Sequence, residues 1–195
     1  MILIKNGKVI KNNQLVKKDI LIEDNKIIKI EDEINYNCEI LDATDCLIMP
    51  GAVDVHVHLR EPGFEYKETV KTGTMSCAKG GVTSIMSMPN LKPCPDNYEN
   101  LKVQLDRIEK DAVVNVYPFG AVTVNEEDKE VADYESMKNH IYGLSDDGRG
   151  VNNLHLLEQA MIFAKENNFT IASHAEDNFY KYAREGEYVA VEREI

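Results

Sequence analysis

Over residues 1–49 apolar and polar positions alternate in short stretches, a pattern typical of half-buried β-strands. Two such stretches flank Asn6-Gly7, a pair that favours a tight hairpin turn with positive φ. Two more flank Asp24-Asn25, which predicts a second hairpin. We therefore expect residues 1–49 to form a small β unit of their own.

From residue 46 onward the pattern changes to strands alternating with helices. The stretch CLIMPGAVDVHVHL is almost continuously apolar, interrupted only at Pro50-Gly51, as expected of a parallel strand buried on both faces. Further strands are predicted at residues 82–88, 113–119, 141–145 and 169–173. Helices are predicted at residues 67–79, about 97–110, 134–139 and 154–166, with Gly80-Gly81 as a left-handed stop and Asp96 or Asn97, and Asn153, as N-caps.

These βα units predict a parallel sheet with right-handed connections. A doubly wound sheet and a barrel both fit, but no GxGxxG follows the first strand, so a dinucleotide-binding sheet has no specific support. A complete (β/α)₈ barrel takes about 250 residues. Residues 50–195 have room for roughly five of its eight strands. We expect an α/β protein in which this second part forms a partial TIM barrel.

Composition narrows the kind of partner. The chain has 34 Asp and Glu against 22 Lys and Arg, a net charge of -12, which disfavours nucleic acid and anionic membrane and leaves a small molecule or another protein. No membrane span or signal peptide is evident, so we expect a cytoplasmic protein. The four cysteines are scattered without a CxxC pair, which argues against disulfides and thiolate metal sites. The acidic residues 126–130 are interpreted as a solvated face.

Candidate metal ligands recur at the carboxyl ends of the predicted strands. In His56-Val57-His58 the two imidazoles project to the same side of a strand, within reach of one metal ion, although two buried hydrogen-bonded histidines would give the same pattern. Asp146-Asp147 follows the strand that ends at Ser145, and His174 follows the strand at 169–173. Because strand ends meet at one mouth of a barrel, this set of nitrogen and oxygen ligands predicts a site for zinc or a similar divalent ion.

The same stretches carry a family resemblance. GAVDVHVHLREPGFEYKETVKTGTMSCAKGGVTSIMSMPNLKPCPD resembles the signature region of dihydroorotases of the amidohydrolase superfamily, and GLSDDG and SHAED resemble two later motifs. The resemblance runs from about Leu47 to Asp177. It implies a partial barrel preceded by a small β-sandwich segment, and one or two zinc ions.

By this resemblance His56 and His58 would bind the first zinc, Asp147 would bridge two metals, and His174 would bind the second. Arg60 and Asn90 would hold the carboxylate of the substrate, and His58 would bind the substrate as well. Guanidinium and amide donors suit a carboxylate, although Arg60 would also fit a surface cation and Asn90 a simple turn residue.

The resemblance implies reversible interconversion of (S)-dihydroorotate and N-carbamoyl-L-aspartate, a step of pyrimidine biosynthesis. Family members also use a histidine from the sixth strand and a proton-shuttling aspartate from the eighth, which would lie beyond Ile195. We therefore expect an N-terminal fragment that is inactive by itself, with no general acid/base in this chain. Its larger assembly would be a homodimer or an association with aspartate carbamoyltransferase.

Two alternatives stay open. Hydantoinase-like and allantoinase-like relatives share HxH and the barrel, but hydantoinases bridge their metals with a carboxylated lysine, where this chain has Ser145-Asp146-Asp147. A non-catalytic partner of aspartate carbamoyltransferase is the other, and the retained ligand positions argue against it.

Overall fold

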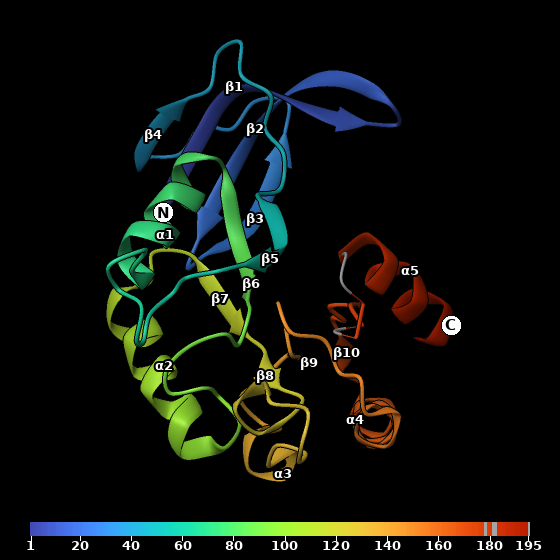
Figure 1. The fold of residues 1–195 in the computed structure, drawn as a ribbon. Helices are drawn as coiled ribbons and strands as arrows, with labels where there is room; N and C mark the ends of the chain where they lie inside the picture. Colours follow the sequence, from blue (N-terminus) through green and yellow to red (C-terminus); the bar gives the residue numbers. More distant parts are fainter. Residues whose placement is uncertain (178, 181–182, 195) are drawn as a thin grey trace. The chain divides into compact units, whose positions relative to one another are not determined.

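The structure is a computed structural model that describes residues 1–177, 179–180 and 183–194. The chain divides into two compact units, Met1–Pro50 and Gly51–Ile195 (Figure 1). Each unit is described by itself.

The first unit is a four-stranded sheet in the order β3-β2-β1-β4. Its strands are β1 (Ile2–Lys11), β2 (Gln14–Glu23), β3 (Lys26–Glu31) and β4 (Glu39–Asp42). β1 is antiparallel to β2 and parallel to β4, and Leu3, Leu21 and Ile34 form the core. The predicted hairpin at Asp24-Asn25 is confirmed, because both residues have positive φ and join β2 to β3.

The predicted turn at Asn6-Gly7 is wrong, because β1 continues through this pair. The pairing with β2 shifts register between Ile4 and Gly7, so the pair forms an irregularity inside the strand. Asn6 does have a positive φ of 67°, and its backbone N–H donates to Asp19 Oδ1 at 2.9 Å. The hairpin turn lies at Asn12-Asn13, with φ of 51° and 60°.

The second unit contains two three-stranded parallel sheets, β5-β6-β7 and β10-β9-β8. Their strands are β5 (Ala52–Val57), β6 (Val82–Ser87), β7 (Asn115–Pro118), β8 (Gly120–Ala121), β9 (Gly143–Ser145) and β10 (Thr170–Ile171). In place of the single strand predicted at 113–119, the structure has two strands, β7 and β8, separated by Phe119. β7 belongs to one sheet and β8 to the other. The succession of parallel βα units confirms the α/β class, while closure into a barrel stays a prediction.

The expectation that the first strand of this unit is buried on both faces is wrong. Val53 and Val55 are each 61% exposed, and within the described residues β5 pairs with β6 only, so it is an edge strand. It also begins at Ala52 rather than at residue 46, because Leu47 belongs to the first unit, where it forms a bridge with Lys8.

The four predicted helices are present, and a 3₁₀ turn and a further helix, neither of them predicted, occur as well. They are α1 (Val70–Lys79), α2 (Tyr98–Asp111), the 3₁₀ turn η1 (Val124–Glu126), α3 (Tyr134–Met137), α4 (Leu154–Asn167) and the unpredicted α5 (Ala183–Glu194). Asn97 caps α2 and Asn153 caps α4 by accepting backbone N–H groups. After α1 the left-handed residue is Gly81, since Gly80 is still helical.

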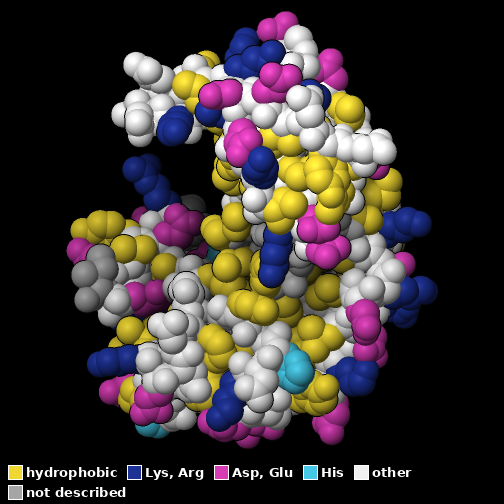
Figure 2. All heavy atoms as spheres, turned by 180° about the vertical axis from the view of Figure 1, so that it is seen from behind, with side chains coloured by type: hydrophobic (Ala, Val, Ile, Leu, Met, Phe, Trp, Pro, Cys, Tyr) yellow, Lys and Arg dark blue, Asp and Glu magenta, His cyan; other side chains and the backbone are white. Residues whose placement is uncertain are grey.

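The main core of this unit lies under α2, α3 and α4. Its buried members include Leu101, Val122, Met137, Leu144 and Ala160. Acidic and basic side chains are interspersed around hydrophobic ones on the face shown in Figure 2. None of the helices within the described part of the chain is both long and apolar enough to cross a membrane.

Candidate metal centre

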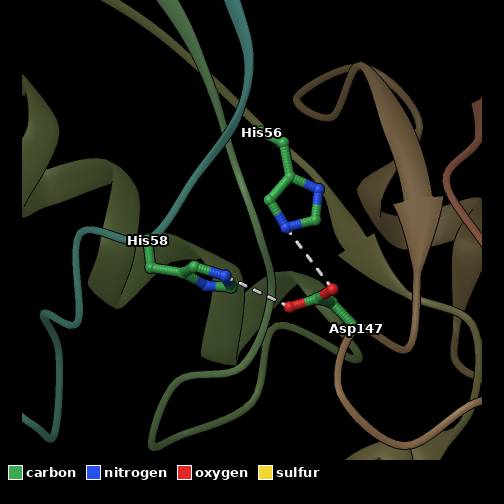
Figure 3. Close-up of side chains that lie close together, drawn as sticks. All are labelled: His56, His58 and Asp147. Atoms are coloured by element: carbon green, nitrogen blue, oxygen red, sulfur yellow. Dashed lines mark ion pairs between the residues drawn. The ribbon is translucent and has the colours of Figure 1, made fainter. Parts of the chain in front are cut away.

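Three side chains from two sheets converge at the carboxyl ends of their strands. His56 lies near the end of β5 and His58 just beyond it, while Asp147 follows β9 by two residues. Figure 3 shows both imidazoles pointing at the Asp147 carboxylate. His56 Nε2 lies 3.4 Å from Asp147 Oδ1, and His58 Nε2 lies 3.3 Å from Asp147 Oδ2. Strand alternation, which places His56 and His58 on one side, therefore also points them at a third candidate ligand, Asp147.

These distances suit a metal ion. Each of the three residues offers one ligand atom, and the three atoms lie within 4.8 Å of one another. Nitrogen and oxygen ligands about 2.0–2.2 Å from a tetrahedral zinc stand roughly 3.3 Å apart, close to the separations between the imidazole nitrogens and the carboxylate oxygens here. The donor set and its spacing therefore fit a divalent cation.

Asn90, which follows β6, fixes the orientation of His58. Its Oδ1 lies 2.9 Å from His58 Nδ1, and its Nδ2 donates to Asp147 Oδ2 at 2.8 Å and to the Asp147 carbonyl at 2.9 Å. Since an amide oxygen only accepts, Nδ1 carries the proton and the Nε2 lone pair faces Asp147. Burial lowers the pKa of His58, an effect that the Asn90 hydrogen bond partly opposes, so the neutral ligand form is favoured.

His174 lies at the margin of this group. Its Nδ1 is 4.0 Å from Asp147 Oδ1, and its Nε2 is 3.0 Å from Glu176 Oε2. The backbone of His174 and Glu176 passes close to Gly150, which has a φ of 68°. A Cβ at this position would lie only 2.7 Å from the carbonyl oxygens of His174 and Glu176, so the arrangement requires glycine. The structure thus brings His56, His58 and Asp147 together and places His174 between Asp147 and Glu176, at the edge of that group.

The adjacent Asp146 has a different environment. It is 2% exposed, and its Oδ1 accepts the backbone N–H groups of Val122 at 2.7 Å and Thr123 at 3.1 Å. The Thr123 hydroxyl donates to its Oδ2. Burial raises the pKa of Asp146, although these hydrogen bonds act in the opposite direction. Asp146 therefore holds the strand-end backbone, while Asp147 faces the histidines.

A pocket of about 910 Å³ adjoins the cluster, and Arg60, Asn90 and Asp147 all line it. Arg60 has a φ of 61°, and its carbonyl accepts the Phe64 N–H at 2.9 Å. Lys92 lines the same pocket from the loop after β6.

The sequence interpretation missed Glu126, which also lines the pocket. It is 7% exposed, so the expectation that the whole acidic run at 126–130 is solvated is wrong. Burial raises the pKa of Glu126 to about 8, and the nearby Asp146 adds to the shift. The signal that could have identified it is its position shortly after a strand end, on the same edge as the candidate metal ligands.

The chain is similar to dihydroorotases in sequence. A family model described as Dihydro-orotase-like matches residues 45–188. The dihydroorotase of Fusobacterium nucleatum subsp. nucleatum is 44% identical over 177 residues, covering 90% of this chain and 42% of that protein. The dihydroorotase of Macrococcus caseolyticus is 41% identical over 182 residues, covering 92% and 43%. The chain thus spans less than half the length of these relatives.

Solved hydantoinases have a similar fold. An L-hydantoinase (dihydropyrimidinase) from Arthrobacter aurescens aligns with a TM-score of 0.77 at 20% identity, covering 91% of this chain and 41% of that one. A D-hydantoinase (dihydropyrimidinase) from Thermus sp. aligns with a TM-score of 0.73 at 27% identity, covering 91% and 40%. The likeness to the first of these concerns the fold alone.

Proposed function

The chain belongs to the dihydro-orotase-like family, and from that premise we propose that it carries the metal-binding part of a cyclic-amide hydrolase. The proposed reaction is the reversible interconversion of (S)-dihydroorotate and N-carbamoyl-L-aspartate. The observation that carries the proposal is the convergence of His56, His58 and Asp147, whose ligand atoms lie within 4.8 Å of one another.

In this proposal His56, His58 and Asp147, together with His174, hold one or two zinc ions. A divalent metal supplies a nucleophile from water at neutral pH and polarises a carbonyl. The chain's own residues prepare the site: Asn90 holds the proton of His58 on Nδ1 and keeps Nε2 free as a ligand atom.

Arg60 is the proposed carboxylate-binding residue. It lines the pocket beside Asp147, and its planar guanidinium can bind a carboxylate through two parallel hydrogen bonds. Asn90 and His58 are proposed to contact the substrate as well. In the structure Asn90 Oδ1 is paired with His58 and Asn90 Nδ2 donates to Asp147. Asn90 can therefore contact the substrate only if its Nδ2 donates to the substrate and to Asp147 at the same time.

The chain spans less than half the length of its curated relatives, and the family resemblance implies a further histidine and an aspartate on later strands of the barrel. For residues 1–195 we therefore propose metal and substrate binding, rather than turnover, as the properties to measure. Association with another copy or with aspartate carbamoyltransferase stays a prediction.

A hydantoinase-like activity is the second candidate, favoured by the structural likeness to hydantoinases. Two features of this chain weigh against it. The residues that end β9 and follow it are Ser145, Asp146 and Asp147, with no lysine to carry the bridging carboxylate, and Arg60 supplies a partner for a carboxylate-bearing substrate.

Zinc binding tests the metal centre directly. Bound zinc would be measured by plasma mass spectrometry and titration calorimetry in the wild-type chain and in His56→Ala and His58→Ala. We expect each substitution to weaken zinc binding by at least about 100-fold, since it removes a ligand. His155→Ala is the matched control because His155 lies exposed on α4. Equal zinc binding by all four proteins would contradict the proposal.

A further inference from the structure

The pocket beside the candidate metal centre is lined by both basic and acidic side chains. Basic side chains line it from the loops after β5, β6 and β9, namely Arg60, Lys67, Lys92 and Arg149. Glu126 reaches it from the loop after β8, and Asp147 lines the same space. A ligand in this pocket therefore meets both cationic groups and carboxyl groups.

Glu126 is buried without a full set of partners. The residue is 7% exposed, and within the described residues its Oε1 has no hydrogen-bond partner. Nearly all buried polar side-chain atoms in proteins are hydrogen-bonded, because an orphaned one loses its hydration without replacement. Burial accordingly raises the pKa of Glu126 to about 8. A group from a bound ligand would supply the missing partner.

The loop holds Glu126 in place at some conformational cost. Asn125 and Glu126 have φ values of 54° and 55°, a left-handed conformation that is uncommon for residues other than glycine. Asp96 Oδ2 accepts the Asn125 N–H at 3.0 Å, and Arg149 Nη1 donates to the Glu126 carbonyl at 3.3 Å. These contacts fix the backbone on both sides of the Glu126 side chain, so its position does not depend on the carboxyl group finding a protein partner.

We propose that Glu126 is a specificity-determining residue whose carboxyl group accepts a hydrogen bond from the terminal ureido NH₂, or from the corresponding ring N–H, of the ligand that Arg60 holds by its carboxylate. The choice of ligand rests on the function proposed above, since both dihydroorotate and N-carbamoyl-aspartate carry a carboxylate and N–H donors. A cationic ligand group suits the pocket less well, because Arg60, Lys67 and Lys92 line it too.

Two ligands that differ in one group test the assignment. N-carbamoyl-L-aspartate and N-acetyl-L-aspartate carry the same two carboxylates, but the acetyl compound has a methyl group in place of the terminal NH₂. Their dissociation constants would be measured by calorimetry on the zinc-loaded 195-residue chain. We expect the wild type to prefer the carbamoyl ligand by about tenfold, as one hydrogen bond would give.

The variants separate hydrogen bonding from shape. Glu126→Met keeps the length of the side chain but removes the acceptor, so the two ligands should bind this variant with about equal dissociation constants. Glu126→Gln keeps a carbonyl acceptor and should retain the preference. A preference retained in Glu126→Gln and lost in Glu126→Met would show that the loss comes from the missing acceptor and not from disturbance of the loop by a substitution. Glu130→Met is the matched control, because Glu130 is exposed in the same acidic run and lies outside the residues that line the pocket.

The outcomes distinguish this proposal from the function on which it rests. If the wild type binds both ligands and Glu126→Met keeps the tenfold preference, or if the wild type shows no preference, the role of Glu126 is refuted while the proposed function stands. If the wild type binds neither ligand, the proposed function fails and the assignment of Glu126 fails with it.

Discussion

Two adjacent aspartates are expected to respond to the same substitution in opposite ways. Asp146 is 2% exposed and accepts the backbone N–H groups of Val122 and Thr123, whereas Asp147 faces His56 and His58. Asp146→Ala should therefore cost folding stability, and Asp147→Ala should cost metal affinity.

The magnitude for Asp146 follows from its hydrogen bonds. Alanine leaves two buried backbone donors, Val122 N–H and Thr123 N–H, without an acceptor, and each such loss costs about 1–3 kcal/mol. Removing a carboxyl group whose pKa is raised by burial offsets part of this cost. We expect a net loss of roughly 2–4 kcal/mol in the free energy of unfolding. With a urea m-value of about 2 kcal/mol/M, the midpoint should fall by about 1–2 M.

Asp147→Ala removes a carboxylate that accepts one side-chain hydrogen bond from Asn90 and is partly exposed. The unfolding free energy of the metal-free chain should change by less than about 1 kcal/mol. Zinc affinity should fall by at least about 100-fold, because a ligand that lies between two histidines is lost.

Urea titrations followed by circular dichroism and zinc titrations by calorimetry on both variants would decide the matter. The reasoning is refuted if Asp146→Ala unfolds at the wild-type urea concentration. It is refuted equally if Asp146→Ala loses zinc affinity while Asp147→Ala retains it.

Two further predictions concern Asn90 and Glu126. Asn90→Leu should weaken zinc binding by about 10- to 100-fold in calorimetry, because His58 loses the acceptor that holds its proton on Nδ1; unchanged affinity would show that His58 needs no such partner. The pKa of Glu126 is raised from 4.5 to about 8, so the folded state binds its proton more tightly, and the stability that this proton contributes is lost as pH rises from about 5 to beyond 8. Urea midpoints at pH 5 and pH 8.5 should therefore differ more in the wild type than in Glu126→Gln, and an equal difference would refute the burial argument.

The order of the βα units and the candidate ligands could be predicted from the sequence because both are local properties. Apolar periodicity marks strands and helices residue by residue, and two histidines separated by one residue on a strand must project to the same side. The caps of α2 and α4 are likewise local, since Asn97 and Asn153 accept N–H groups from residues two or three positions ahead.

Only the tertiary structure decided what each local signal is used for. Positive φ at Asn6 serves an irregularity inside β1 rather than a turn, because the choice depends on pairing with β2 and on Asp19, thirteen residues away. Asp146 and Asp147 have different environments because Asp146 contacts Thr123 and Asp147 contacts Asn90, and both partners lie far away in sequence. Glu126 belongs to an acidic run that looks solvated, and it is buried because the backbone on either side of it is held by other loops. Burial and partner choice depend on contacts between distant segments, and such contacts leave no periodic pattern in the chain.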